Sequence, residues 1–111
     1  MQKTLTLEGK QVRAVSSAVL PRLYRFHFGK DLIMEMEKLR KTYQEDPGSV
    51  DFAPIENLTW LMLKEGGEDV GESPEEWLRT VNDISAVYTL SADVMQLWQA
   101  SQATTSKPKK K

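Results

Sequence analysis

Proline positions limit where helices can run in this chain. Pro21, Pro54 and Pro74 each lie close to the beginning of a stretch with apolar residues at helical spacing. A proline breaks the interior of a helix but is well tolerated in its first turn, so each of the three predicts a helix start. The segment Asp46-Pro47-Gly48-Ser49 predicts a turn. The prolines therefore divide the chain into short helices.

The residues before the first proline have a different periodicity. Residues 4–7 and residues 11–15 both alternate apolar and polar side chains, which is the period of a strand with one buried face. Gly9-Lys10 lies between them, and glycine at the first central position is typical of a type II′ turn. We therefore expect a β-hairpin over residues 3–15.

Helical spacing of apolar residues predicts four to five helices within residues 17–101. Ser16-Ser17 would open the first helix, Gly29 would end it as a left-handed C-cap, and Asp31 would cap the second. The segment from Pro54 to Lys64 is apolar on most sides after its first turn and should be the most buried helix. The apolar stripe of the second helix consists of Leu32, Met36, Leu39 and Tyr43. That of the last helix consists of Val87, Leu90, Val94, Leu97 and Trp98.

Ser73-Pro74-Glu75-Glu76 is the strongest local signal in the chain. Ser73 can accept a hydrogen bond from the backbone N–H of Glu76, and the Glu76 carboxylate can reach back to Ser73, which together form a capping box. Pro74 fits the first helical position. These residues predict a short helix whose inner face carries Trp77, Leu78 and Val81.

A chain of 111 residues, 40% of them hydrophobic, allows one small core. We expect a single domain over residues 1–101, followed by a disordered, lysine-rich tail over residues 102–111, which has no large apolar side chain. The predicted fold class is mainly α: an N-terminal β-hairpin, a bundle of four to five helices and a disordered basic tail.

Residues that carry chemistry are scarce. The chain has no cysteine and one histidine, His27, which lies between two phenylalanines and is typical of a packing residue. Gly66-Gly67 and Gly71 do not match a dinucleotide-binding or phosphate-binding loop. We therefore expect no catalytic residue, cofactor or metal site, and no enzyme. The longest wholly apolar run, residues 60–63, is too short to cross a bilayer.

The net charge of -1 conceals a segregation of charge along the chain. Residues 1–43 carry nine basic and four acidic residues, residues 44–106 carry two basic and twelve acidic ones, and residues 107–111 carry four lysines. One interpretation is a set of solvated faces with a basic tail. The other is a subunit with one positive and one negative surface, which would self-associate head to tail into an open spiral or a ring.

Two groups of residues are candidates for partner binding. Arg22, Tyr24 and Arg25 combine positive charge with an aromatic ring, as in grooves that hold single-stranded nucleic acid, but the sequence pI of about 5.8 argues against a phosphate-binding domain. Trp60 is a candidate binding residue for a protein partner, because Leu58 and Leu61 can fill the core without it.

Five segments in order resemble the tail assembly chaperones of long-tailed phages and prophages. They are residues 21–25 with 28–31, the preceding hairpin, residues 56–62, residues 75–78 and residues 94–98. Their order and spacing agree over residues 3–101. Thr59 stands where alanine is common in that family.

This resemblance implies a non-enzymatic helper of tail assembly. Such proteins coat the tape-measure protein, recruit tail-tube subunits around it and leave before the tail is complete. The chain would be the short form, made without ribosomal frameshifting, in the cytoplasm of the bacterial host and absent from the finished virion. The alternative is a small phage-encoded nucleic-acid-binding or regulatory protein.

Overall fold

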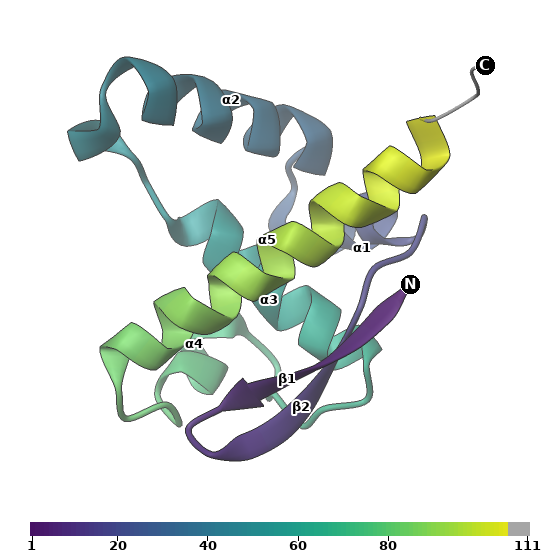
Figure 1. Ribbon diagram of the computed structural model, residues 1–111, viewed down its shortest axis with the longest axis vertical. Coiled ribbons are helices and arrows are strands. Elements are labelled where there is room, and N and C mark those ends of the chain that lie inside the picture. The colour runs from purple at the N-terminus through teal and green to yellow at the C-terminus, as the bar shows by residue number, and fades with distance from the viewer. Residues whose placement is uncertain (107–111) are drawn as a thin grey trace.

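The computed structural model describes residues 1–106, with side chains as far as Gln102. Two antiparallel strands, β1 (Gln2–Leu7) and β2 (Lys10–Val15), precede the helices. The helices are α1 (Leu20–Phe28), α2 (Leu32–Glu45), α3 (Ala53–Glu65), α4 (Pro74–Leu78) and α5 (Ile84–Ser106), with a 3-10 turn η1 (Pro47–Ser49) before α3. The predicted fold class, a hairpin followed by four to five helices, is confirmed (Figure 1).

The hairpin turn lies one residue earlier than predicted. Leu7 pairs with Lys10, so the two-residue loop is Glu8-Gly9 and not Gly9-Lys10. Both loop residues have positive φ, 50° for Glu8 and 83° for Gly9, which is the pattern of a type I′ turn. The type II′ prediction is therefore wrong, because the register of the strands places a non-glycine residue in the left-handed region.

Several predicted helix boundaries are confirmed, but the start of the first helix and the end of the last helix are wrong. Gly29 is left-handed, with φ 70°, and its N–H bonds the carbonyl oxygen of Arg25, as expected of a C-cap. The Asp31 carboxylate accepts from the N–H of Met34 at 2.9 Å. The first helix does not open at Ser16-Ser17, however: α1 begins at Leu20, and the buried Ser16 hydroxyl instead lies 2.7 Å from that of Ser101 on α5.

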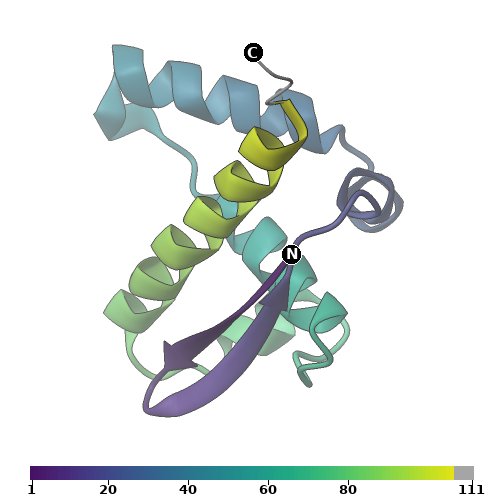
Figure 2. The same cartoon turned by 45° about the vertical axis from the view of Figure 1, so that its right-hand side comes forward.

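The core is built around α3, as predicted. Every residue from Leu58 to Leu63 is buried, so this helix has neighbours on all sides in its second half. The hairpin covers two helices at once, β2 packing against α3 and β1 against α5 (Figure 2). At the C-terminal end of α3 the approach to β2 is so close that a Cβ on Gly66 would lie 2.1 Å from the carbonyl oxygen of Arg13.

A buried polar pair joins α3 to α5. Thr59 is fully buried, and its hydroxyl donates to the carbonyl oxygen of Ile55 at 2.7 Å and lies 3.3 Å from the Ser91 hydroxyl. Buried hydroxyls cost free energy unless they are hydrogen-bonded, and here both belong to one network. The side chain that distinguishes Thr59 from an alanine is therefore used in the packing of α3 on α5.

Two carboxylates fasten the hairpin to distant parts of the chain. Glu8 in the turn accepts from the N–H groups of Asn82 and Asp83, at 3.0 and 2.8 Å, just before α5 begins. Glu68, in the loop after α3, accepts from the N–H of Arg13 on β2 at 2.9 Å. Hydrogen bonds to ionised acceptors are stronger than neutral ones, so these contacts fix the hairpin against the helices.

The last helix is longer than predicted. Its stripe of Val87, Leu90, Val94, Leu97 and Trp98 is buried as expected, but α5 continues to Ser106, whereas we expected a tail from Gln102. No proline occurs between Pro74 and Pro108, so nothing in residues 102–106 forces the helix to stop. The remaining part of the predicted basic tail, residues 107–111, lies outside the described residues.

Candidate functional site

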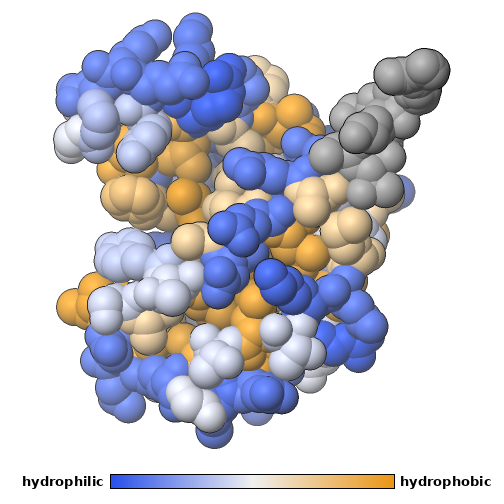
Figure 3. Space-filling model, in the orientation of Figure 1, coloured by the Kyte–Doolittle hydropathy of each residue, from blue (hydrophilic) through white to orange (hydrophobic). Residues whose placement is uncertain are grey.

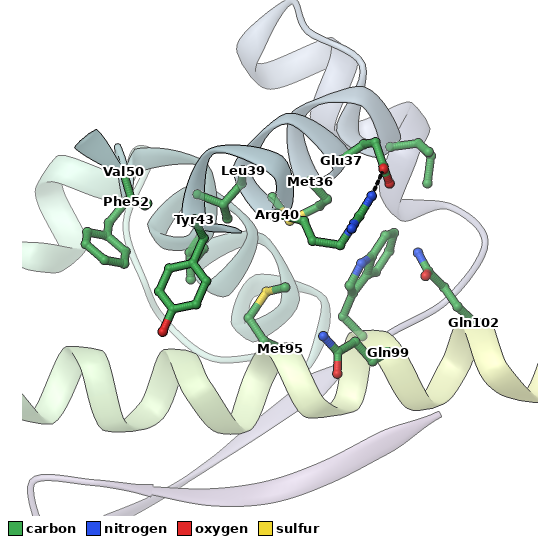
Figure 4. Close-up of a pocket in the computed structure, with 13 residues that line it drawn as sticks. Met36, Glu37, Leu39, Arg40, Tyr43, Val50, Phe52, Met95, Gln99 and Gln102 are labelled. Atoms are coloured by element: carbon green, nitrogen blue, oxygen red, sulfur yellow. Dashed lines mark hydrogen bonds and ion pairs between the residues drawn. The ribbon is translucent and has the colours of Figure 1, made fainter. Parts of the chain in front are cut away.

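A mostly apolar hollow on the described surface lies between α2 and α5. We call it the α2–α5 groove; its volume is about 510 Å³. Figure 4 shows Met36, Leu39 and Tyr43 pointing from α2 toward α5, with Met95 pointing back from α5. The full lining is Ile33, Met36, Glu37, Leu39, Arg40, Tyr43, Val50, Phe52, Ile55, Met95, Trp98, Gln99 and Gln102.

The groove exists because α2 stands away from the rest of the molecule. This helix packs against α1, η1 and α3, and lies opposite the hairpin in both ribbon views (Figures 1 and 2). Its apolar stripe is buried at Leu32 and Met36 but is uncovered farther on, where Tyr43 is 61% exposed. The stripe was predicted correctly; what the periodicity did not show is that its last residue, Tyr43, is left largely uncovered within the chain.

The outer and inner sides of α2 differ in character. In the space-filling view, hydrophilic side chains cover the outer side of α2 at the top, while apolar residues gather beneath it where the surface is hollowed (Figure 3). Exposed aromatic residues continue this surface: Phe52 is 42% and Tyr88 48% exposed, and their rings pack edge to face at 5.7 Å. Grouped apolar exposure of this kind marks interaction surfaces in soluble proteins.

Charge in the groove is sparse and largely neutralised. Glu37 and Arg40 lie one turn apart on α2 and form an ion pair with each other. The hydrogen bond that Arg40 donates to Glu37 lowers the pKa of the Glu37 carboxyl. Beyond Phe52, outside this lining, burial and then the nearby Asp51 raise the pKa of Glu56. Desolvation and a like charge both oppose ionisation, so the pKa of this carboxyl lies above its usual value.

The residues predicted from sequence to bind a partner do not form one surface. Arg22 and Arg25 are exposed on α1, but Tyr24 and Trp60 are buried, with 0% and 1% exposure. The Tyr24 hydroxyl lies 3.5 Å from Glu35, and burial raises the pKa of Tyr24 to about 12. In this conformation neither ring is available to a partner.

The expectation that Trp60 lies outside the core is wrong. Its indole N–H donates to the carbonyl oxygen of Val70 at 3.1 Å, and its ring packs edge to face against His27 and Phe28 at 5.1 and 5.9 Å. The loop after α3 thus folds back and covers the tryptophan. Buried indole N–H groups normally find such an acceptor, but the acceptor here comes from a loop whose path the sequence does not specify.

An exposed aromatic residue on α1 was not singled out by the sequence. Phe26 is 81% exposed, beside the exposed Arg22 and Arg25. Its position just outside the apolar stripe of Leu23, Tyr24 and Phe28 was the available signal, because α1 buries the opposite side against α3. His27 is exposed next to it and contacts Trp60, which agrees with a packing role.

The cap residues lie where the sequence placed them. The N–H of Glu76 donates to the Ser73 hydroxyl at 3.2 Å, and α4 begins at Pro74. Within the described residues there is no return bond from the Ser73 N–H to Glu76, so half of the predicted capping box is present. The Glu76 carboxylate lies instead over Gly71, where an added Cβ would come 2.6 Å from it.

Two further classes of site are absent from residues 1–106. No group of three or more His, Cys, Asp or Glu side chains in that range could hold a metal ion. No helix there has both the length and the apolar character needed to cross a membrane. Comparison of the chain with family models, with curated proteins and with solved structures found no match.

Proposed function

We propose that the protein is a phage tail assembly chaperone that coats the tape-measure protein. The α2–α5 groove is the observation that supports this function, since it exposes apolar and aromatic side chains that the chain itself does not cover. The order of five sequence segments, described above, is the reason for choosing this class among proteins that work by contact. The proposed role is non-enzymatic.

The groove is suited to temporary cover. A tape-measure protein is long and largely helical, with apolar faces that need protection until the tail tube surrounds them. Many subunits with individually weak contacts would together hold such a partner in the host cytoplasm, because several linked contacts bind far more tightly than any one of them alone. The same weakness would let tail-tube subunits displace them, so that the protein is absent from the finished virion.

Self-association is part of the proposal. Arg22 and Arg25 lie exposed on α1, while the loop and helix start over residues 65–76 carry six of the sixteen acidic residues. Opposite charges on separate elements would attract neighbouring subunits head to tail, giving an open spiral or a ring. Such contacts weaken as salt is added.

Co-expression with a tape-measure protein, followed by pull-down, tests the proposed function. We expect the tape-measure product to stay soluble and to be captured. Phe52→Asp should abolish capture, because it places a charge in the groove, while the fold should tolerate it, since Phe52 is 42% exposed and precedes the first residue of α3. Phe26→Asp, an equal change on α1, is the matched control and should capture normally. Equal capture by both variants would contradict the groove's role.

One alternative, a nucleic-acid-binding protein, is favoured by the surface of α1. Two basic side chains and an exposed aromatic ring lie together there: Arg22, Arg25 and Phe26. Binding of a single-stranded oligonucleotide at physiological salt, lost in a chain of residues 1–102 and in Phe26→Ala, would establish this alternative. We expect feeble, sequence-independent attraction that vanishes with added salt.

A further inference from the structure

The α2–α5 groove continues beyond Phe52 into a second hollow. That hollow has a volume of about 290 Å³ and shares Phe52, Ile55 and Met95 with the groove. Its own lining adds Glu56, Tyr88, Ser91 and Ala92. The two hollows are therefore adjacent along α5, and we call them together the extended groove.

The length of the extended groove matches a short helix. Along α5 its lining runs from Tyr88 to Gln102, fourteen residues apart, which is about 21 Å at 1.5 Å per residue. An extended peptide would cover that distance with about six residues, whereas a helix would use about four turns. The walls are themselves helices, and packing an apolar helical face between two helices is a common mode of recognition.

The side chains of the lining can adapt to such a face. Met36 and Met95 project toward each other from the two walls (Figure 4), and methionine fills irregular gaps because it is flexible and polarizable. Tyr43, Phe52 and Tyr88 supply partly exposed rings along the rim. This composition favours binding of the apolar face of a partner helix over binding of a polar ligand.

One charge in the extended groove has no counterpart. Glu37 and Arg40 neutralise each other, and the far end is lined by the uncharged Gln99 and Gln102. Glu56 has no ion-pair partner among the described residues, and the nearest charge that influences it is another carboxylate, Asp51. The Tyr88 end of the groove is therefore negative while the rest is apolar and neutral.

We propose that the extended groove binds an amphipathic helix of about four turns that carries a lysine or arginine at the end facing Glu56. The proposal rests on the proposed function, because it specifies which part of the partner the groove takes. The apolar stripe would pack between Met36 and Met95, and the basic side chain would pair with Glu56. A second copy of this chain is the competing occupant, and the experiment below separates the two.

Two synthetic peptides of about 16 residues are the probes. Both have leucines at i, i+3, i+4 and i+7 spacing; one has lysine at both ends and the other glutamate, so that either orientation places a defined charge beside Glu56. The chain has five methionines, whose methyl groups report binding by NMR: Met36 and Met95 lie in the groove, and Met1, Met34 and Met62 lie outside its lining.

We expect both peptides to shift the methyl signals of Met36 and Met95 and to leave the other three unchanged. The lysine peptide should bind three- to fivefold more tightly, the range for a partly exposed ion pair. Glu56→Lys should reverse that preference, and Glu72→Lys, an equal change on the exposed loop before α4, should keep it.

Several results would overturn the proposal. Three of them are no binding by either peptide, equal affinity for both peptides, and shifts confined to Met1 or Met34. The fourth is movement of the Met36 and Met95 signals with protein concentration when no peptide is present. That result would assign the groove to a second copy of this chain. If the peptides behave as expected but the tape-measure protein is not captured, the proposed function fails and the groove's specificity stands.

Discussion

Gly66 gives the sharpest test of how the hairpin packs on the helices. Its φ is not in the left-handed region, so an alanine there would be free of backbone strain. The obstacle is steric: the new Cβ would lie 2.1 Å from the carbonyl oxygen and 2.7 Å from the carbonyl carbon of Arg13. Both are backbone atoms of β2, which no side-chain rotation can move.

The expected cost follows from what must shift. Overpacking typically costs 1–3 kcal/mol, and β2 resists displacement because the Arg13 N–H is bonded to Glu68. We expect Gly66→Ala to lower the free energy of unfolding by about 3 kcal/mol, which for a domain of this size lowers the Tm by about 10–20 °C. Urea unfolding followed by the fluorescence of the three buried tryptophans measures it.

Two other glycines serve as controls. Gly48→Ala has neither positive φ nor a close contact, its nearest neighbour being the Asp46 carboxylate at 3.6 Å, so its effect should stay within about 0.5 kcal/mol. Gly67→Ala has open space but φ +90°, and should cost about 1–2 kcal/mol through strain alone. If Gly66→Ala unfolds at the same urea concentration as Gly48→Ala, the close approach of α3 to β2 is not real.

Three further predictions concern the cap, a buried phenol and assembly. Ser73→Ala should destabilise by about 0.5–2 kcal/mol in thermal melts; an unchanged Tm would mean that the hydroxyl bond to Glu76 contributes nothing. The folded state raises the pKa of Tyr24 to about 12 from 10.0. The neutral phenol therefore contributes its full stabilisation below pH 10, and this stabilisation is lost as the pH rises through 12. The free energy of unfolding should fall by about 1.4 kcal/mol per pH unit in that window. Urea unfolding at pH 9–12 should show this fall, and Tyr24→Phe should remove it; the same fall in the variant would assign it to other groups. Light scattering should show oligomers that grow with concentration and dissociate in high salt, whereas a strict monomer in low salt would refute head-to-tail association.

The sequence predicted those features that neighbouring residues determine. The caps at Gly29, Asp31 and Ser73 depend on backbone groups within four residues, and the apolar stripes depend on helical period alone. The hairpin was predicted too, but its turn type was not, because register depends on which cross-strand pairs pack best.

The periodicity of the apolar residues could not predict the candidate site. A stripe shows which face of α2 is apolar but not whether another helix covers it, so the groove at Tyr43 and Met95 became visible with the tertiary arrangement. Trp60 was misassigned for the same reason, since the Val70 carbonyl that binds its indole is ten residues away in a glycine-rich loop.

The contacts of the hairpin also set an order of events during synthesis. Glu8 bonds the N–H groups of Asn82 and Asp83, Ser16 bonds Ser101, and β1 packs on α5, so the first strand meets its partners at the other end of the chain. Closing so long a loop is entropically costly and slow compared with forming the helices between. While the ribosome is still translating, the hairpin has α3 as a neighbour but not α5. The hairpin is therefore made before its partners on α5 and is locked in place only after α5 has been translated.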